Sequence, residues 1–233
     1  MNILSAGAAK GLLLAMASRE QIELKGEFGA VGAIRERLRA GAPCDLIVLT
    51  ASMIADLVAI GEVDAESVVA LGQVYTGVAV LSEAPLACVD DVDSLRRLLS
   101  DATKLYFPDP SRATAGIHFM KVLTELGLAE SHQHGFATFP NGASAMRAMA
   151  DAGDAGAVGV TQCPEILYTD GVRYVGALPR PFELATVYSA AVTKRAEPAG
   201  EAVRLLRALS ASNNAAIRRS AGFESSSDTV PSP

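Results

Sequence analysis

The chain has 233 residues, of which 50% are hydrophobic and 20% are charged, and its formal net charge is −6. This composition is typical of a globular protein with enough apolar side chains for one or two cores. The negative charge argues against nucleic acid or an anionic membrane as a partner, because both are bound through clustered lysine and arginine. It does not exclude a small anion, which responds to the local field of its site.

The sequence predicts no membrane insertion. No stretch approaches the roughly 20 consecutive apolar residues that span a bilayer, and no basic segment with an apolar run precedes the first strand. We therefore expect a cytoplasmic protein, or a periplasmic one if the given sequence is a processed form. Cys44, Cys88 and Cys163 are separated cysteines without metal spacing, so we expect reduced thiols.

The first part of the chain alternates short strands with helices. The expected elements are a strand at 3–6, a helix at 8–18, a strand at 22–28, a helix at 29–41, a strand at 45–50 and a helix at 53–61. The strand DLIVLT (45–50) is a continuous apolar run, as expected for a strand buried on both faces. Strand–helix–strand repetition with short connections predicts a parallel sheet flanked by helices.

Two long β-like segments, 68–85 and 183–193, break this rhythm. The expected elements between and after them are a helix at 93–101, a strand at 104–107, a helix at 113–126, a strand at 134–139, a helix at 142–152, a strand at 155–160 and helices at 197–211 and 213–220. The long segments would be crossover strands that act as a hinge, with the ligand in the cleft between two lobes. A single continuous α/β domain is the alternative.

The predicted lobes follow from these crossovers. Residues 1–79 and 189–223 would form the first lobe, and residues 80–188 would form the second, inserted lobe. The polar, proline-bearing tail 224–233 is expected to be disordered.

The junctions between strands and helices are rich in small and hydroxyl residues. They are SAGAAKG (5–11), FGAVGA (28–33), LTAS (49–52), DPSRATAG (109–116), PNGAS (140–144) and VTQCPE (160–165). In open parallel sheets the ligand lies beyond the carboxyl ends of the strands, where helix N-termini present unpaired N–H groups and a partial positive charge. The sequence therefore predicts a small anionic ligand bound by main-chain amides and hydroxyls.

Arg112 is the sharpest single candidate for contacting this ligand. Its guanidinium matches a carboxylate and stands beside a helix start, although an exposed loop arginine is the alternative. Ser5 is expected to donate to a ligand or to cap the first helix, and Lys10 to meet a carboxylate or solvent. Asp109 precedes a proline and would order its turn or act as a base, while Ser111 and Thr114 are the expected N-cap donors.

Acid–base chemistry has two further candidates. His118 has a side chain that titrates in the right range, and a core or interlobe histidine is the alternative. Tyr188, on the second long β segment, is expected to turn its hydroxyl into the cleft. No nucleophile elbow, phosphate loop, HExxH or paired catalytic carboxylates occur, and GAVGAI has too few glycines for a dinucleotide fingerprint. We therefore expect neither a cofactor nor a metal, and the pattern leaves the oligomeric state open.

Six segments in this order resemble the molybdate-binding-like branch of the type II periplasmic binding proteins. They are ILSAGAAKGLL, FGAVGAI, AGAPCDLIVLT, LGQVYTGVAVLSEAP, DPSRATAGIHFMKVLTELG and LATVYSAAV, and the resemblance covers residues 2–223. It implies a two-lobed Venus-flytrap α/β fold with mainly parallel sheets flanked by helices and two crossover hinge strands. The resemblance places ligand donors at Ser5, Gly32, Thr50, Thr76, Ser111, Thr114 and Tyr188. Gly7, Asn141 and Gln162 at the junctions, with Arg112, complete the predicted binding residues.

The resemblance also narrows the function. Molybdate binders of this branch carry hydroxyl residues at the first two junctions, of the type AASL and GSSG, whereas here the second junction, FGAVGA, has none. The branch includes aconitate isomerase, which moves a double bond in a tricarboxylate by a 1,3-proton shift without a cofactor. The resemblance therefore implies an isomerase of a small unsaturated di- or tricarboxylate, with His118, Lys10 and Tyr188 as candidate bases. The alternative is a plain anion-binding protein, either a transporter's solute receptor or an intracellular sensor.

Overall fold

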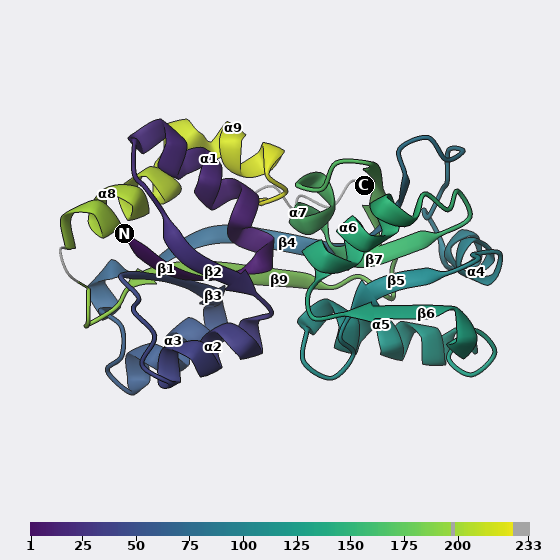
Figure 1. Ribbon diagram of the computed structural model, residues 1–233, viewed down its shortest axis with the longest axis horizontal. Helices are drawn as coiled ribbons and strands as arrows, with labels where there is room; N and C mark the ends of the chain where they lie inside the picture. The colour runs from purple at the N-terminus through teal and green to yellow at the C-terminus, as the bar shows by residue number, and fades with distance from the viewer. Residues whose placement is uncertain (197–198, 226–233) are drawn as a thin grey trace. The chain divides into compact units, whose positions relative to one another are not determined.

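The computed structural model describes residues 1–196 and 199–225, which divide into two compact units (Figure 1). Unit 1 comprises Met1–Val74 and the chain from Thr186 onward, and unit 2 comprises Tyr75–Ala185. The changes of unit fall within β4 (Val69–Leu81) and β9 (Ala185–Val192). The chain thus passes between its units along two long strands, and the changes lie a few residues before the expected positions after residues 79 and 188.

Unit 1 is built around a mainly parallel sheet. Its strand order is β2 (Lys25–Gly29), β1 (Asn2–Ala6), β3 (Leu46–Thr50) and β9, of which only β9 runs antiparallel to its neighbour β3. Four of the five β3 residues are buried, as its apolar run predicts. On one face lie α1 (Lys10–Glu20), α8 (Ala199–Ser210) and α9 (Ala215–Ser220), and on the other α2 (Val31–Arg39) and α3 (Ala51–Ala59) (Figure 1). Short 3₁₀ turns occur at Gly7–Ala9, Ala65–Ser67 and Ser212–Asn214.

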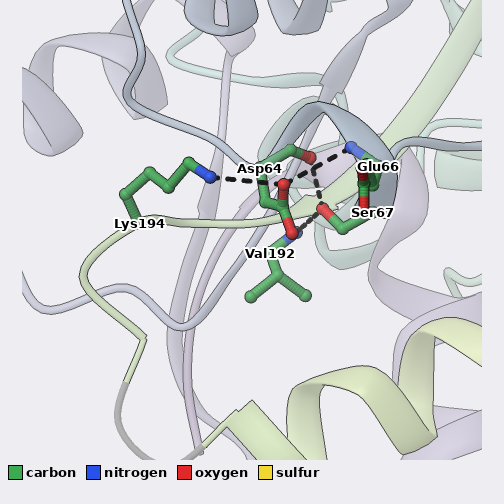
Figure 2. A network of polar contacts seen from close by, with 5 residues as sticks. All are labelled: Asp64, Glu66, Ser67, Val192 and Lys194. Carbon is green, nitrogen blue, oxygen red and sulfur yellow. Dashed lines mark hydrogen bonds and ion pairs between the residues drawn. The ribbon is translucent and has the colours of Figure 1, made fainter.

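A network of hydrogen bonds and an ion pair connects the end of β9 to the turn that precedes β4 (Figure 2). The Ser67 hydroxyl donates to the Asp64 carbonyl oxygen at 2.7 Å and accepts the Val192 N–H at 2.9 Å. Lys194 places its ammonium 3.3 Å from the Asp64 carboxylate. Val192 pairs with Leu46, the first residue of β3, so this network stabilises the edge of the sheet at which the parallel strands begin.

Unit 2 repeats the mainly parallel arrangement. Its parallel strands lie in the order β6 (Phe136–Phe139), β5 (Leu105–Pro108) and β7 (Val158–Gln162), and β4 runs antiparallel to both β7 and β8 (Val172–Ala177). Side chains of α4 (Val92–Ser100) and α5 (Thr114–Glu125) share one hydrophobic cluster. Side chains of α6 (Gly142–Ala152) and α7 (Cys163–Leu167) share another. A 3₁₀ turn at Gln133–Gly135 precedes β6.

The structure corrects the predicted elements in a few places. Strand β8 and helix α7 were not expected, and β7 begins at Val158 rather than at residue 155. The tail expected to be disordered from residue 224 is ordered at its start, where Glu224 forms an antiparallel bridge with Gln73; residues 226–233 of that tail lie outside the described residues.

None of the helices in the described ranges has the length and apolar character needed to cross a membrane.

Candidate functional site

Predicted site residues gather at the edge of the unit 1 sheet where the parallel strands end. Ser5 pairs with Val48 of β3, and Thr50 at the end of β3 pairs with Tyr188 of β9. The helices that follow these strands start at the same edge, because parallel strands end together. The residues brought to this edge are Ser5, Gly7, Lys10, Gly32, Thr50 and Tyr188.

Two of the hydroxyls at this edge bond to the chain itself. Ser5 is fully buried and its hydroxyl donates to the Ala6 carbonyl oxygen at 2.9 Å. The Thr50 hydroxyl accepts the Met53 N–H at 3.4 Å and thereby caps α3. Tyr188 is 3% exposed, and its ring packs edge-on against Phe223 with centroids 6.3 Å apart. The side chains of Ser5 and Thr50 therefore contribute to local structure in unit 1.

Positive charge at this edge comes from α1 and α2. Lys10 is the first residue of α1, and its ammonium lies 5.7 Å from the centroid of the Phe28 ring on β2. Arg35 lies one turn after Gly32, and its Nε atom is buried with no hydrogen-bond partner in the described part of the chain. A buried guanidinium N–H without an acceptor is costly, so Arg35 is a candidate for binding a carboxylate. Sequence analysis missed Arg35, although its spacing of three from Gly32 places both on one helix face.

The helices α1 and α2 also begin without side-chain caps. The helix α1 continues from the 3₁₀ turn Gly7–Ala9, whose N-cap is Ala6, and the N-cap of α2 is Ala30; neither alanine supplies a side-chain acceptor. The first N–H groups of an uncapped helix attract an anion. The carboxyl edge of unit 1 thus combines two cations with two uncapped helix starts.

Unit 2 has the same organisation at its own carboxyl edge. β5, β6 and β7 end there in parallel, and the antiparallel β4 places Thr76 opposite Gln162, the last residue of β7. Both residues are buried, with 0% and 3% of their surface exposed. Within the described residues, the Thr76 hydroxyl has no hydrogen-bond partner. The structure thus places Thr76, Gln162, Ser111, Arg112, Thr114 and Asn141 along one edge of this unit.

The junction before α5 is a turn held together by Asp109. One oxygen of its carboxylate accepts the main-chain N–H of Ser111 at 2.7 Å and the Ser111 hydroxyl at 2.6 Å. These hydrogen bonds hold the pKa of Asp109 below its usual value, so the group orders the turn as a carboxylate. The N-cap of α5 is Ala113, which supplies no side-chain acceptor, rather than Ser111 or Thr114 as expected. Arg112 is exposed beside this uncapped helix start.

His118 lies one turn inside α5 and contacts a loop of the same unit. Its Nε2 atom is 2.8 Å from the Phe182 carbonyl oxygen. A carbonyl oxygen only accepts, so Nε2 carries the proton in this contact and Nδ1 remains as the basic nitrogen. A role for His118 as a base would therefore involve Nδ1.

The junction before α6 is organised differently. The Asn141 side-chain oxygen accepts the Ser144 N–H at 2.9 Å and caps the helix. The carboxyl group of Glu165, from α7, lies against the same helix start and accepts the Thr161 hydroxyl at 2.6 Å. Burial raises the pKa of Glu165, while hydrogen bonds from Thr161 and from the main chain of Ala143, Gly142 and Gln162 oppose that shift. The α6 start therefore already holds a carboxyl group of the chain.

A cavity of about 610 Å³ lies in unit 2, away from this edge. Its lining includes the start of β7, residues of α4 and the segment around Cys88. The cavity therefore lies at the opposite edge of the sheet, where the parallel strands begin, and its lining contains none of the predicted site residues. No cluster of three or more His, Cys, Asp or Glu side chains suited to a metal occurs in the described ranges.

Comparisons with known proteins give the chain's relatives. A family model described as bacterial extracellular solute-binding protein matches residues 3–224. Aconitate isomerase from a Pseudomonas species is 29% identical over 185 residues, which make up 79% of this chain and 68% of that protein.

Solved structures with a similar fold include two oxyanion binders. The periplasmic molybdate-binding protein of Azotobacter vinelandii aligns over 100% of both chains at 18% identity, with a TM-score of 0.73. The sulfate-binding protein SubI of Mycobacterium tuberculosis aligns over 100% of this chain and 92% of its own at 17% identity, with a TM-score of 0.69. At these identities the structures show the fold alone. The comparisons confirm the expected two-lobed α/β fold and the resemblance to molybdate-binding-like proteins.

Proposed function

Since the chain belongs to the bacterial extracellular solute-binding protein family, we propose that it binds a small unsaturated di- or tricarboxylate and isomerises it. The observation that carries this proposal is the similarity to aconitate isomerase over most of the chain. Binding of a solute is the part that the family's description covers; an anionic solute and its isomerisation go beyond that description.

The charges at the two carboxyl edges suit a ligand with several separate negative groups. Lys10 and Arg35 supply cations in unit 1, and Arg112 supplies one in unit 2. An arginine binds a carboxylate through two parallel hydrogen bonds, and a helix start adds main-chain N–H groups. A tricarboxylate carries several separate carboxylates, and the cations and helix starts of each unit suit such groups. A compact tetrahedral oxyanion would instead need hydroxyl donors at the second junction, where Ala30 and Gly32 offer none.

The chemistry is a proton shift along an allylic system, with no net gain or loss of atoms. A base removes a proton from the saturated carbon next to the double bond, and the electron pair delocalises across that bond toward a carboxylate. The base exchanges its proton with solvent and delivers a proton to the carbon two positions away, and the double bond moves. Arg112 and the α5 start would stabilise the negative charge that develops on the carboxylate. Candidate bases are Nδ1 of His118, Lys10 and Tyr188, and a cofactor is not part of the proposal.

A second candidate function is binding without turnover. It is favoured by the family's description as solute-binding and by the oxyanion-binding proteins that share the fold. The protein would then be the anion receptor of a transporter or an intracellular sensor.

A ligand screen followed by exchange in heavy water separates these functions. Thermal unfolding is measured with molybdate, tungstate, sulfate, phosphate, citrate, and cis- and trans-aconitate. Stabilisation by tricarboxylates, with deuterium uptake and a moved double bond by proton NMR, is the expected result. Stabilisation by tetrahedral oxyanions without turnover would favour the receptor and contradict the isomerase.

Variants of the candidate bases then identify the residue that moves the proton. His118→Gln, Lys10→Met and Tyr188→Phe are compared for deuterium uptake and for ligand-induced stabilisation. Loss of uptake with retained stabilisation would assign the base. Unchanged uptake in all of the variants would remove these residues from the mechanism.

A further inference from the structure

The main-chain N–H groups at the start of α6 bond to the chain itself. Those of Gly142 and Ala143 contribute hydrogen bonds to the Glu165 carboxyl group. That of Ser144 bonds to the Asn141 side chain, and that of Ala145 makes a helical bond to the Asn141 carbonyl oxygen at 3.1 Å. A helix start leaves its first N–H groups without helical partners, and here side chains of the chain take that place.

The Glu165 carboxyl group fits this position closely. It is buried, and it reaches the α6 start from α7, with Thr161 near the end of β7 supplying a hydroxyl donor at 2.6 Å. A β-carbon added at Gly142 would lie 1.8 Å from the Thr161 hydroxyl oxygen and 2.0 Å from a Glu165 carboxyl oxygen. Only glycine therefore allows the carboxyl group to approach the backbone at this point. Glycine, hydroxyl and amides together form a carboxyl-binding pocket, defined by Gly142, Ala143 and Thr161.

The neighbouring junction also has a carboxylate of the chain, Asp109, but this group orders the turn before α5 and does not cap the helix. β5 and β6 are parallel neighbours, so α5 and α6 start at the same edge of the unit 2 sheet. The α5 N-cap is Ala113, without a side-chain acceptor, and the exposed Arg112 stands beside it. Hydrogen bonds from Ser111 and from the main chain of Arg112, together with the Arg112 charge, lower the pKa of Asp109. An incoming negative group would therefore find N–H donors and a cation at α5.

We propose that Glu165 is a specificity-determining residue whose carboxyl group fills the Gly142–Ala143–Thr161 pocket from within the chain. The start of α6 is thereby closed to the solute. The start of α5, with Arg112, remains to bind the solute's negative charge in unit 2. This inference rests on the proposed function only for the identity of the solute. The pocket itself is a site for a carboxylate, and it is tested without any solute.

Chemical rescue of an emptied pocket is the direct experiment. Glu165→Ala removes the resident carboxyl group and leaves space for a small carboxylate, so sodium formate should bind there. Formate should raise the Tm of Glu165→Ala saturably, by about 2–4 °C, because a ligand bound only by the folded state stabilises it. Wild-type protein should show a smaller shift, because its pocket is filled and formate can bind only at the α5 start; sodium chloride at equal concentration controls for ionic strength. Equal formate effects on variant and wild type, or no effect on the variant, would overturn the proposal.

Two further arms keep the test decisive. If Glu165→Ala does not fold unaided, refolding yields are compared, and formate but not chloride should restore folded protein; equal yields in the two salts would count against the pocket. Thr161→Val in the Glu165→Ala background removes one donor and should weaken the formate effect severalfold. An undiminished effect would exclude this position as the place where formate binds.

The solute arm separates this inference from the proposed function. Citrate affinities of wild type and of formate-filled Glu165→Ala should agree within about twofold, because the solute does not use the pocket. A loss greater than about tenfold in the variant would contradict closure of α6 to the solute. Failure of the isomerase proposal would instead appear as absent turnover in heavy water, with the formate rescue intact.

Discussion

The starts of α5 and α6 occupy equivalent places in unit 2 but are completed in different ways. Each follows a parallel strand of the same sheet, and the sequence predicts both junctions as walls of an anion site. At α6 the chain supplies Asn141 and Glu165 as acceptors, whereas the α5 N-cap supplies none. At α6 the glycine at the helix start, Gly142, admits a close approach of a carboxyl group. Whether that group is a solute or the chain's own carboxyl depends on a residue from elsewhere in the sequence.

Filling the α6 pocket with a methyl group should produce the largest effect. Gly142→Ala places a β-carbon within 2.0 Å of both Thr161 and Glu165. These groups must move apart to make room for it, which should lower the free energy of unfolding by about 2–3 kcal/mol. Urea denaturation measures the loss. Gly135→Ala is the matched control in the same unit, because its added carbon would lie no closer than 3.6 Å to its neighbours. Equal losses in the two variants would show that the pocket is not tightly occupied.

The α5 start should respond in ligand affinity rather than in stability. Arg112→Ala should weaken binding of a tricarboxylate about tenfold or more, because a charge-assisted hydrogen bond is lost. The Tm of the empty protein should barely change, since Arg112 is exposed. Isothermal titration calorimetry measures the affinity, and Arg97→Ala, which alters an arginine in the cavity lining, is the control. Unchanged affinity in Arg112→Ala would contradict the assignment of α5.

Removing the α6 cap should lower stability and leave ligand affinity unchanged, which is the reverse of the result expected for Arg112→Ala. Asn141→Ala deletes the acceptor for the Ser144 N–H and should cost about 1 kcal/mol of stability. Tricarboxylate affinity should stay at the wild-type value, because α6 is closed to the solute. Asn141→Ser retains a capping oxygen and should recover most of the loss. A weaker ligand with unchanged stability would indicate that Asn141 contacts the solute after all.

The pH dependence of stability should give the smallest signal. Burial raises the pKa of Glu165 above its ordinary value of 4.5, so the unfolded chain releases this proton at lower pH than the folded protein. The stability that the protonated Glu165 contributes is fully present below pH 4.5 and is lost as the pH rises through the raised pKa of Glu165 in the folded protein. Glu165→Gln does not titrate, so its stability relative to wild type should increase with pH over that range, as measured by urea denaturation at several pH values. A constant difference would mean that folding does not shift this pKa.

The fold was largely predictable because its strands and helices carry strong local signals. The apolar run 45–50 and the two long β segments correspond to β3, β4 and β9, and Gly61, with φ of +74°, follows α3 at the end of the helix expected at 53–61. α7 was missed because a helix of five residues is too short to show a periodic pattern, although Pro164 near its start was a usable signal. β8 was missed because its pairing with β4 joins distant segments of the chain.

The sequence predicted the sheet edge at which the candidate site lies, but it did not predict which side chains contact each helix start there. Small residues after each strand correctly indicated that helix starts gather there. The partner of each helix start was not readable, because Glu165, Thr161 and Gly142 come from three separate segments. Arg35 was overlooked for a similar reason, since the burial of its Nε depends on tertiary packing. The roles of His118, Lys10 and Tyr188 stay predictions.

An amide-resolved NMR titration with citrate and trans-aconitate distinguishes solute binding at α5 from binding at α6. Binding at α5 predicts saturable shifts of the main-chain N–H signals from Ser111 to Gly116, with those from Gly142 to Ser144 unmoved. Saturable shifts at the α6 start without any at α5, or no saturable shift at either, would contradict it.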